Sequence, residues 1–489
     1  MNKMTKILIL NPPTKEGIYI NRDQMGGMGQ RLSFGKSLLT SFLGKMKSSF
    51  IRQPVFQLVY AATILSESND VLVIDSLNEN LSLNDIIKKA IKFCPEYTIM
   101  AVSSSDILYE RDVVAKKIKE CTKSKIITIG DTITNSPSLF KEPFDISITG
   151  EVEGVVKDII DKKKLSRISG IIYIEKGKAK TNKRKELLNE EELEKIKFPK
   201  WEIFPYKKYR YYPLLYNEPA VSMLSSRGCP YACYYCSYSK NEGEKLRMRN
   251  AKNVVDEIEN NIKKYGINGI VFRDPLFTGN RKRTKEVCRL IIKKNLNIGW
   301  ACETRPELLD EEILKEMRNA GCRAINMGIE SINEKELNSV GRNKVDLNKL
   351  KKIIECCNKL GIRTTGFFIL GLPESTKESM NKTIEFSLNS GLNHAEYKIA
   401  TPYPGTKLRE IAIKNNWLKN NNIKNLGGYD AVMCINKEIS PEYIDNLCNN
   451  SFKKFYYRFS WIWQELRMGD NLKKANFFVK TIFRVMTGK

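Results

Sequence analysis

Three cysteines, Cys229, Cys233 and Cys236, lie close together in the segment SSRGCPYACYYCSYSK. Thiolates are soft ligands that suit zinc, copper(I) or iron–sulfur clusters. A structural zinc site needs four ligands, but the only histidine, His394, and the remaining cysteines are distant in sequence. A four-iron cluster held by three cysteines keeps one iron open for a substrate or cofactor. The spacing therefore favours such a cluster. The alternatives are three unrelated buried cysteines or a zinc site with a distant fourth ligand.

The cysteine segment directly follows the first of six predicted strands in the second half of the chain. These strands are predicted at 220–226, 269–274, 298–303, 324–330, 363–371 and 395–400. Helical patterns lie between them, for example at 254–266, 310–321 and 347–361. Six consecutive βα units predict a partial (β/α)6, TIM-like barrel that is open on one side. Because chemistry in such barrels occurs at the carboxyl ends of the strands, the cysteines are expected there.

The first third of the chain predicts a second α/β unit. Apolar runs at 6–10, 71–76, 97–105 and 125–131, and another that begins at 145, alternate with helical patterns at 55–68, 84–94 and 113–121. Continuous apolar runs between helices are typical of a parallel, doubly wound, Rossmann-like sheet. Ligands of such sheets bind at the carboxyl ends of the strands. The candidate binding residues at these ends are Asn11, Pro12, Asp75, Ser103, Ser104, Gly130 and Gly150.

These patterns predict four regions: residues 1–160, a linker at 161–215, the barrel at 216–415 and a helical region at 416–489. The first region contains a long insertion, 17–54, whose glycines in GGMGQ (26–30) would let a ligand approach the backbone closely. The alternative is a surface loop. The tail at 452–489 mixes aromatic and basic residues. It either lies on an anionic membrane surface or packs its aromatics against the barrel.

Composition limits the cellular setting. The 82 basic residues exceed the 56 acidic ones, which gives a formal charge of +26. This charge could attract nucleic acid, anionic lipid or acidic substrates, but the lysines are scattered along the chain, as on ordinary solvated faces. No apolar run reaches the roughly 18 residues that span a bilayer. We therefore expect a cytoplasmic protein with reduced thiols, peripheral to the membrane if the tail binds lipid.

The cysteine segment resembles the radical SAM superfamily, whose CxxxCxxC motif is present as Cys229-Pro-Tyr-Ala-Cys233-Tyr-Tyr-Cys236. The resemblance extends over roughly residues 220–410. It implies a [4Fe-4S] cluster whose open iron binds S-adenosylmethionine. Reductive cleavage of that cofactor, with electrons from a flavodoxin- or ferredoxin-type partner, would then release a 5′-deoxyadenosyl radical that abstracts hydrogen from an unactivated carbon.

The same resemblance implies contacts with S-adenosylmethionine at later strand ends. The motifs are FRDPLFT (272–278), CETRPELLD (302–310), MGIES (327–331), FFILGLPES (367–375) and YKIATPYPGT (397–406). The first departs from many relatives, which have two acidic residues where this chain has Asp274 and Pro275. The residues expected at the cofactor are Tyr235, Asp274, Glu303, Arg305, Glu330, Gly371 and Pro402.

The first region resembles the cobalamin-binding domain that precedes many radical SAM domains. The matching stretches include Asn-Pro-Pro after the first strand, Asp75, Ser103–Ser105, Gly130 and GEVE (150–153). Relatives often have Gly-Gly-x-His after the fourth strand, where this chain has Gly-Asp-Thr-Ile. No histidine precedes His394, so no histidine of this region can ligate cobalt. The rival interpretation is a domain that only positions substrate.

Together these resemblances predict an enzyme, a cobalamin-dependent radical SAM methyltransferase that acts on an unactivated carbon of a small molecule or lipid. The first alternative is radical cyclisation or rearrangement, as in the anaerobic oxidative cyclase of chlorophyll synthesis. RNA modification is disfavoured because the first region lacks a second cysteine set, having only Cys94 and Cys121. No nucleic-acid partner is therefore expected. A non-catalytic cobalamin or redox sensor is the third alternative.

Overall fold

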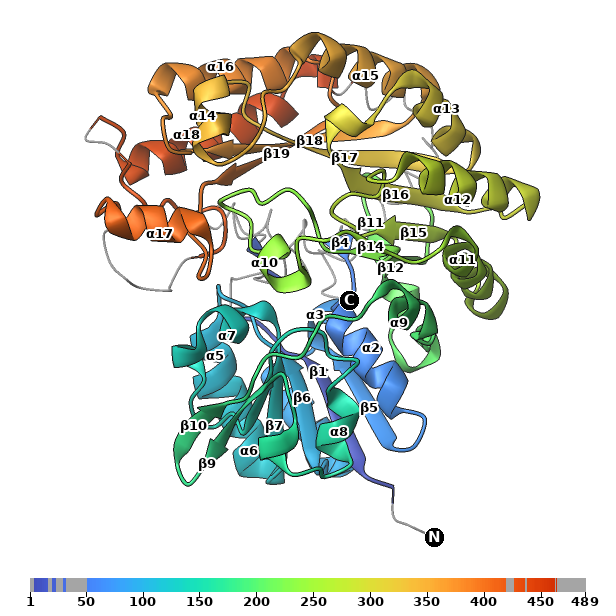
Figure 1. Cartoon of the computed structure of the whole chain (residues 1–489), viewed down its shortest axis with the longest axis vertical. Helices are drawn as coiled ribbons and strands as arrows, with labels where there is room; N and C mark the ends of the chain where they lie inside the picture. Colours follow the sequence, from blue (N-terminus) through green and yellow to red (C-terminus); the bar gives the residue numbers. More distant parts are fainter. Residues whose placement is uncertain are drawn as a thin grey trace.

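The computed structural model describes residues 4–15, 20–22, 30–31, 51–418, 426–435, 438–461 and 463. Two α/β units lie one above the other, and the segment that carries the three cysteines runs between them (Figure 1). The predicted glycine loop GGMGQ lies outside the described residues except for Gln30, and so does most of the tail after Trp461.

The first unit is built on a seven-stranded sheet in the order β10-β9-β8-β7-β6-β1-β5. Its strands are β1 (Lys6–Asn11), β5 (Asp70–Asp75), β6 (Tyr97–Ala101), β7 (Lys125–Ile129), β8 (Ile146–Ile148), β9 (Ile171–Glu175) and β10 (Lys178–Thr181). The five strands from β8 to β5 are parallel, as predicted, and β9 and β10 are antiparallel. The last two lie in the segment predicted as a linker, and they extend the first sheet.

Helices cover both faces of this sheet. On one face α2 (Phe56–Leu65) and α8 (Val156–Ile160) pack on Ile7, Ile9 and Ile99. On the other, α4 (Leu83–Phe93) and α6 (Lys116–Thr122) pack on Leu8 and Leu10. Successive side chains of a strand point to opposite faces, so the apolar run of β1 supplies both cores. The remaining helical segments are α3 (Ser76–Glu79), α5 (Ile107–Tyr109), the π-helix at Glu110–Ala115 and α7 (Asp131–Asn135).

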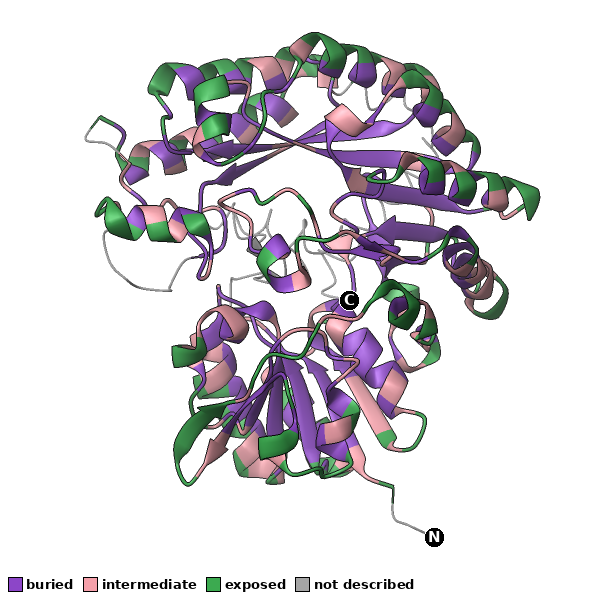
Figure 2. Ribbon diagram, viewed as in Figure 1, coloured by how far each residue is buried: buried purple, intermediate pink, exposed green. Residues whose placement is uncertain are grey.

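The second unit is a six-stranded parallel sheet whose strands follow chain order, β12-β15-β16-β17-β18-β19. The strands are β12 (Ala220–Met223), β15 (Gly269–Phe272), β16 (Gly299–Thr304), β17 (Cys322–Glu330), β18 (Arg363–Leu370) and β19 (His394–Ile399). All six predicted strands are confirmed. Figure 2 shows the strands buried and the helices exposed on their outer faces.

Helices lie between successive strands, as the six βα units require. They are α11 (Ala251–Tyr265), α12 (Arg281–Lys293), α13 (Glu311–Asn319), α14 (Glu334–Ser339), α15 (Leu347–Leu360) and α16 (Lys377–Asn389). After β19 come α17 (Lys407–Lys414) and α18 (Pro441–Tyr456). Phe455 of α18 is fully buried, and Phe452 contacts Tyr397 of β19 with ring centroids 5.3 Å apart. The first part of the aromatic tail therefore packs on the sheet.

Three short strand pairings lie outside the two large sheets. They are β4 (Ile51–Arg52) with β11 (Arg210–Tyr211), β13 (Ser226–Arg227) with β14 (Arg247–Met248), and β2 (Ile20–Asn21) with β3 (Gln30–Arg31). The junction also contains α9 (Glu190–Lys195) and α10 (Tyr238–Glu242). Tyr209, near the end of the predicted linker, donates a hydrogen bond to Asp75 at 2.8 Å, so this part of the linker packs against the first unit.

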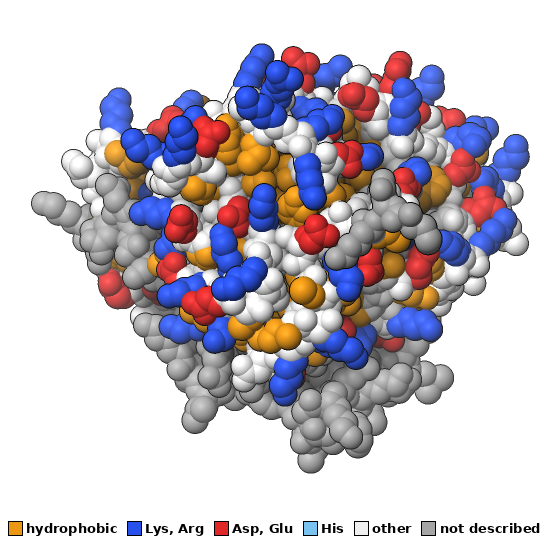
Figure 3. All heavy atoms as spheres, turned by 90° about the horizontal axis from the view of Figure 1, so that it is seen from below, with side chains coloured by type: hydrophobic (Ala, Val, Ile, Leu, Met, Phe, Trp, Pro, Cys, Tyr) orange, Lys and Arg blue, Asp and Glu red, His pale blue; other side chains and the backbone are white. Residues whose placement is uncertain are grey.

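The face at the end formed by the first unit carries charges of both signs. Figure 3 views the molecule from the end formed by the first unit, where Lys and Arg side chains alternate with Asp and Glu and with small apolar areas. On this face the positive charge does not gather into one patch. Within the described residues, no helix combines the length and apolar character that crossing a bilayer requires.

Candidate active site between the two sheets

The three cysteines lie in a loop that backbone contacts hold in place. Gly228 begins the loop with φ +83°, and a Cβ at this position would lie 2.1 Å from the carbonyl oxygen of Lys245. Farther along, Tyr234 N donates to Val340 O at 2.9 Å, and Cys236 N donates to Cys233 O at 3.0 Å. The loop can therefore follow this path only with glycine at position 228.

The three thiols lie near one another and are largely desolvated. The pKa of Cys236 is raised to about 12, mainly by burial and to a smaller extent by the neighbouring Cys233 and Cys229. Burial also raises the pKa of Cys229. Metal coordination deprotonates thiols, so a cationic cluster would supply the charge that this site lacks.

The donor set fits a cluster better than a single ion. A lone zinc ion needs its thiolates about 2.3 Å away and usually four ligands. Among the described residues, no group of three Cys, His, Asp or Glu side chains is arranged to hold one metal ion. A cubane places its cysteine ligands on separate iron atoms, so the ligands need not converge on one point. The zinc alternative therefore lacks the required geometry.

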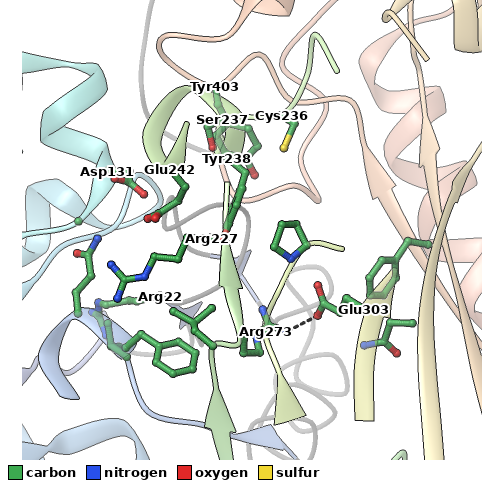
Figure 4. A pocket seen from close by; sticks show the side chains of 18 of the residues that line it. Arg22, Asp131, Arg227, Cys236, Ser237, Tyr238, Glu242, Arg273, Glu303 and Tyr403 are labelled. Atoms are coloured by element: carbon green, nitrogen blue, oxygen red, sulfur yellow. Dashed lines mark hydrogen bonds and ion pairs between the residues drawn. The ribbon is translucent and has the colours of Figure 1, made fainter. Parts of the chain in front are cut away.

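A cavity of about 370 Å³ lies between the carboxyl ends of the two sheets, with Cys236 in its wall. From the first unit it is lined by residues at the ends of β6, β7 and β8, such as Val102, Gly130 and Glu151. From the second it is lined by residues in or directly after all six strands, including Leu224 after β12. Figure 4 shows Arg22 and Asp131 approaching the cavity from the first unit and the paired Arg273 and Glu303 from the second.

Three residues predicted to contact S-adenosylmethionine line this cavity: Tyr235, Glu303 and Glu330. Glu330 ends β17 at a β-bulge with φ +67°, a conformation that re-aims a side chain. Burial raises the pKa of the Glu330 carboxyl, an effect that Arg342 partly opposes. The Arg342 Nη1 atom lies 3.5 Å from Glu330 Oε1. These residues remain candidates for binding a polar cofactor.

The other four predicted cofactor contacts, Asp274, Arg305, Gly371 and Pro402, do not line the cavity. Asp274 is fully buried and accepts hydrogen bonds from Ser225 N at 2.7 Å and Ser226 Oγ at 2.7 Å. Its carboxylate is therefore engaged in fixing the start of the cysteine loop.

Arg305 and the two turn residues likewise have structural partners. The Arg305 guanidinium lies 3.9 Å from the centre of the Tyr231 ring in the cysteine loop. A Cβ at Gly371 would lie 2.9 Å from Ile444 of α18, and the carbonyl of Pro402 accepts from Arg409 at 3.1 Å. These placements support positioning roles.

Of the residues predicted at cobalamin, only Gly130 lines the cavity. Its φ is +121°, and a Cβ there would lie 2.7 Å from the carbonyl oxygen of Val102. Gly150 has φ +103°, and a Cβ there would lie 3.5 Å from the Arg184 side chain. Both glycines therefore permit backbone turns at strand ends.

The polar residues at the other strand ends are satisfied by one another. Asn11 donates to Asp75 Oδ1 at 2.7 Å, and the Asn11 side chain and the Pro12 carbonyl accept from Arg22 at 2.9 and 2.8 Å. Ser103 N donates to Glu110 at 2.7 Å. The Ser104 hydroxyl donates to Leu426 O at 3.3 Å, which ties the end of β6 to the segment after β19.

Several buried polar atoms that the sequence did not single out have no hydrogen-bond partner among the described residues. In the first unit these include the hydroxyls of Thr132, Thr134 and Ser147, next to or near Gly130. In the second unit they include Asn326 Oδ1 and Thr365 Oγ1, both in the cavity wall. Unsatisfied buried polar groups in folded proteins need an explanation, and a bound ligand is one. In the sequence, such positions could have been recognised as polar residues within an otherwise apolar strand.

The chain's only histidine lies away from the cavity. His394 begins β19 and is 4% exposed. Its ring packs near Tyr456 and Trp461, with centroid distances of 6.2 Å to each. It is not among the residues that line the cavity, so any cobalt bound there would have no histidine of this chain beneath it.

Comparisons with known proteins agree with this arrangement. Residues 223–387 match the family model of the radical SAM superfamily. An uncharacterized methyltransferase from Pyrococcus horikoshii is 30% identical over 99% of this chain and 98% of its own length. The anaerobic magnesium-protoporphyrin IX monomethyl ester cyclase of Rubrivivax gelatinosus is 27% identical over 69% of this chain and 62% of its own length.

Among solved structures, the radical S-adenosylmethionine methyltransferase TsrM from Kitasatospora setae, with cobalamin and a [4Fe-4S] cluster bound, has a similar fold. The TM-score is 0.64 at 16% sequence identity, and the match covers 91% of this chain and 85% of that one. The likeness therefore includes both α/β units and their order along the chain.

Proposed function

The chain belongs to the cobalamin-binding radical SAM methyltransferase-like family, and from this premise we propose that it is an enzyme that methylates an unactivated carbon of a small molecule. The observation that carries the proposal is the single cavity that joins the three-cysteine loop to the carboxyl ends of both sheets. A cofactor bound on the first sheet and one bound at the cysteine loop would share that space.

Three cofactors fit the residues present. Cys229, Cys233 and Cys236 would hold a [4Fe-4S] cluster. Glu330, Glu303 and Tyr235 would bind S-adenosylmethionine, and the strand ends around Gly130 would hold cobalamin. When bound, these groups supply radical initiation and methyl transfer.

The protein's own residues orient these groups and exclude water. Asp274 fixes the start of the cysteine loop through Ser225 and Ser226, and Arg305 covers the ring of Tyr231. The largely buried wall would protect a reactive intermediate from solvent. We propose that the six-stranded sheet is the partial barrel that the resemblance implies, open between β12 and β19.

We propose the same four regions as the sequence predicts, except that the first region also includes the β9–β10 hairpin. The cobalamin-binding unit is assigned residues 1–160 together with the β9–β10 hairpin, followed by the rest of the predicted linker. The radical SAM core at 216–415 and the helical region at 416–489 are kept. A flavodoxin- or ferredoxin-type reductant remains the proposed electron donor.

The test is anaerobic incubation of the reconstituted full chain with cobalamin, S-adenosylmethionine and dithionite, followed by mass spectrometry of the nucleoside products. Methyl donation leaves S-adenosylhomocysteine, whereas reductive cleavage leaves 5′-deoxyadenosine. A radical methyltransferase is expected to form both. A cyclase would form only 5′-deoxyadenosine, and a sensor would form neither. The Cys233→Ala variant should lose 5′-deoxyadenosine, and Cys288→Ala, a buried cysteine of α12, should keep it.

A further inference from the structure

Two neighbouring polar side chains in the cavity wall have unused hydrogen-bonding atoms. Asn326 on β17 is 2% exposed and Thr365 on β18 is 5% exposed. Within the part of the chain that the structure describes, neither Asn326 Oδ1 nor Thr365 Oγ1 has a hydrogen-bond partner. Both residues line the cavity.

The two side chains form a pair because of the sheet register. Asn326 and Thr365 are direct partners in the parallel β17–β18 ladder, and partners in register point to the same face of a sheet. Asn326 Nδ2 donates to the hydroxyl of Tyr211 at 2.9 Å. This bond fixes the amide and leaves Oδ1 as the available acceptor, next to the Thr365 hydroxyl, which can donate or accept.

Four charged residues near this pair form two ion pairs. Arg273 forms an ion pair with Glu303, and Lys398 Nζ lies 2.9 Å from Glu396 Oε1. All four residues line the same cavity. Within these two ion pairs the charges balance, so the pairs themselves offer no net charge to an ionic group. A neutral group therefore suits this part of the wall best.

Resting on the proposed function, we propose that Asn326 and Thr365 recognise the substrate, and that the part of the substrate that binds there carries a neutral O–H or N–H group. One hydroxyl satisfies both residues, because it can donate to Asn326 Oδ1 and accept from Thr365 Oγ1. A hydrocarbon end would leave both atoms unsatisfied. Sites built to hydrogen-bond a substrate group can reject analogues that lack this group by factors of about 10⁴. The substrate class is thus a polar small molecule, and a lipid entering by its hydrocarbon end is disfavoured.

The experiment uses phenol and toluene as probes, because they have nearly the same shape and differ in one O–H donor. Dissociation constants are measured by isothermal titration calorimetry on the anaerobically reconstituted full chain. The toluene-to-phenol ratio of dissociation constants is compared among the wild type, Asn326→Leu and Thr365→Val. We expect the ratio to fall about tenfold in each variant, the size of one lost hydrogen bond.

Thr364→Val is the matched control. Thr364 is the adjacent residue on β18, but it is fully buried outside the cavity wall and its hydroxyl donates to Asn393 at 3.2 Å. The ratio should be unchanged in this variant. A ratio that is the same in the wild type, Asn326→Leu and Thr365→Val would overturn the inference.

A third arm separates substrate from cofactor. If S-adenosylmethionine displaces phenol competitively, the pair belongs to the cofactor site and the inference is wrong; simultaneous binding supports it. The same preparations are assayed for 5′-deoxyadenosine. Absence of that product with a retained phenol preference counts against the proposed function and leaves the recognition pair standing. Presence of the product without the preference counts against the pair alone.

Discussion

Arg227, two residues before the first cysteine of the loop, forms a buried ion pair with Glu151 of the first unit. The Arg227 Nη1 to Glu151 Oε1 distance is 2.9 Å, and the two side chains are 6% and 5% exposed. Arg227 also pairs with Glu153, and Arg247 Nη1 lies 3.0 Å from Glu151 Oε1. The GEVE segment, which the resemblance implied at cobalamin, thus connects the first sheet to the cysteine loop.

Removal of Arg227 should destabilise the junction. Arg227→Ala leaves Glu151 and Glu153 buried with fewer partners, and breaking one side of a buried ion pair costs about 3–5 kcal/mol. We expect a clear decrease in melting temperature by circular dichroism and less iron bound after reconstitution. Lys157→Ala, which removes an exposed pair with Asp161, should leave the melting temperature close to that of the wild type, because exposed ion pairs contribute little to stability. Equal effects of the two substitutions would contradict the assigned role of Arg227.

Substitution of Gly228 should disturb the loop through backbone overlap. In Gly228→Ala the new Cβ would lie 2.1 Å from the Lys245 carbonyl oxygen, in addition to the roughly 1 kcal/mol cost of alanine at positive φ. We expect most of the bound iron to be lost, as measured by colorimetric iron analysis. Gly177→Ala is the matched control, since Gly177 has φ +73° and a Cβ there would have no atom within 4 Å. It should keep the iron content of the wild type.

Asp106 should make stability fall as pH rises. Burial, assisted by the charge of Glu110, raises the pKa of Asp106 from 3.8 to about 6, and Lys15 and Arg22 oppose this shift. Between pH 3.8 and about pH 6, Asp106 is therefore protonated in the folded state and ionised in the unfolded state. The resulting penalty is absent below pH 3.8 and complete above pH 6, and amounts to about 3 kcal/mol.

Asp106→Asn should remove that penalty while keeping an acceptor for Lys15 N, which donates to Asp106 at 3.0 Å. Relative to the wild type, the variant should gain more stability at pH 7.5 than at pH 4.5, as measured by urea unfolding. Asp85→Asn is the control and should change stability by nearly the same amount at both pH values, because the Ser82 hydroxyl lowers the pKa of Asp85 from 3.8 and this carboxyl titrates below the tested range. The same difference at both pH values for Asp106→Asn would refute the prediction.

The sequence predicted the sheets well because their signal is local. The apolar runs at 6–10 and 97–101 form buried parallel strands, and the three cysteines of the CxxxCxxC motif lie directly after β12 and β13. The β9–β10 hairpin was placed in a linker because its second strand, KAKT, is exposed at every residue and carries no apolar pattern.

The roles of individual site residues are harder to predict from the sequence, because they depend on contacts between distant segments. Asp274 was expected at the cofactor, but its hydrogen bonds to Ser225 and Ser226 are visible only once β12 and β15 are paired. Asn326 and Thr365 were missed because their pairing depends on strand register. A sequence motif identifies a residue type at a strand end. Whether that residue contacts a ligand or supports the fold depends on its neighbours in the folded protein.

The central claim is that Cys229, Cys233 and Cys236 hold a four-iron cluster with one open iron. The most direct test is Mössbauer spectroscopy of the anaerobically reconstituted, ⁵⁷Fe-labelled full chain, with and without S-adenosylmethionine. We predict a [4Fe-4S] spectrum in which one iron site changes when S-adenosylmethionine is added, and loss of that spectrum in Cys233→Ala but not in Cys288→Ala. A wild-type spectrum that S-adenosylmethionine leaves unchanged, or a [4Fe-4S] spectrum that persists in Cys233→Ala, would contradict the claim.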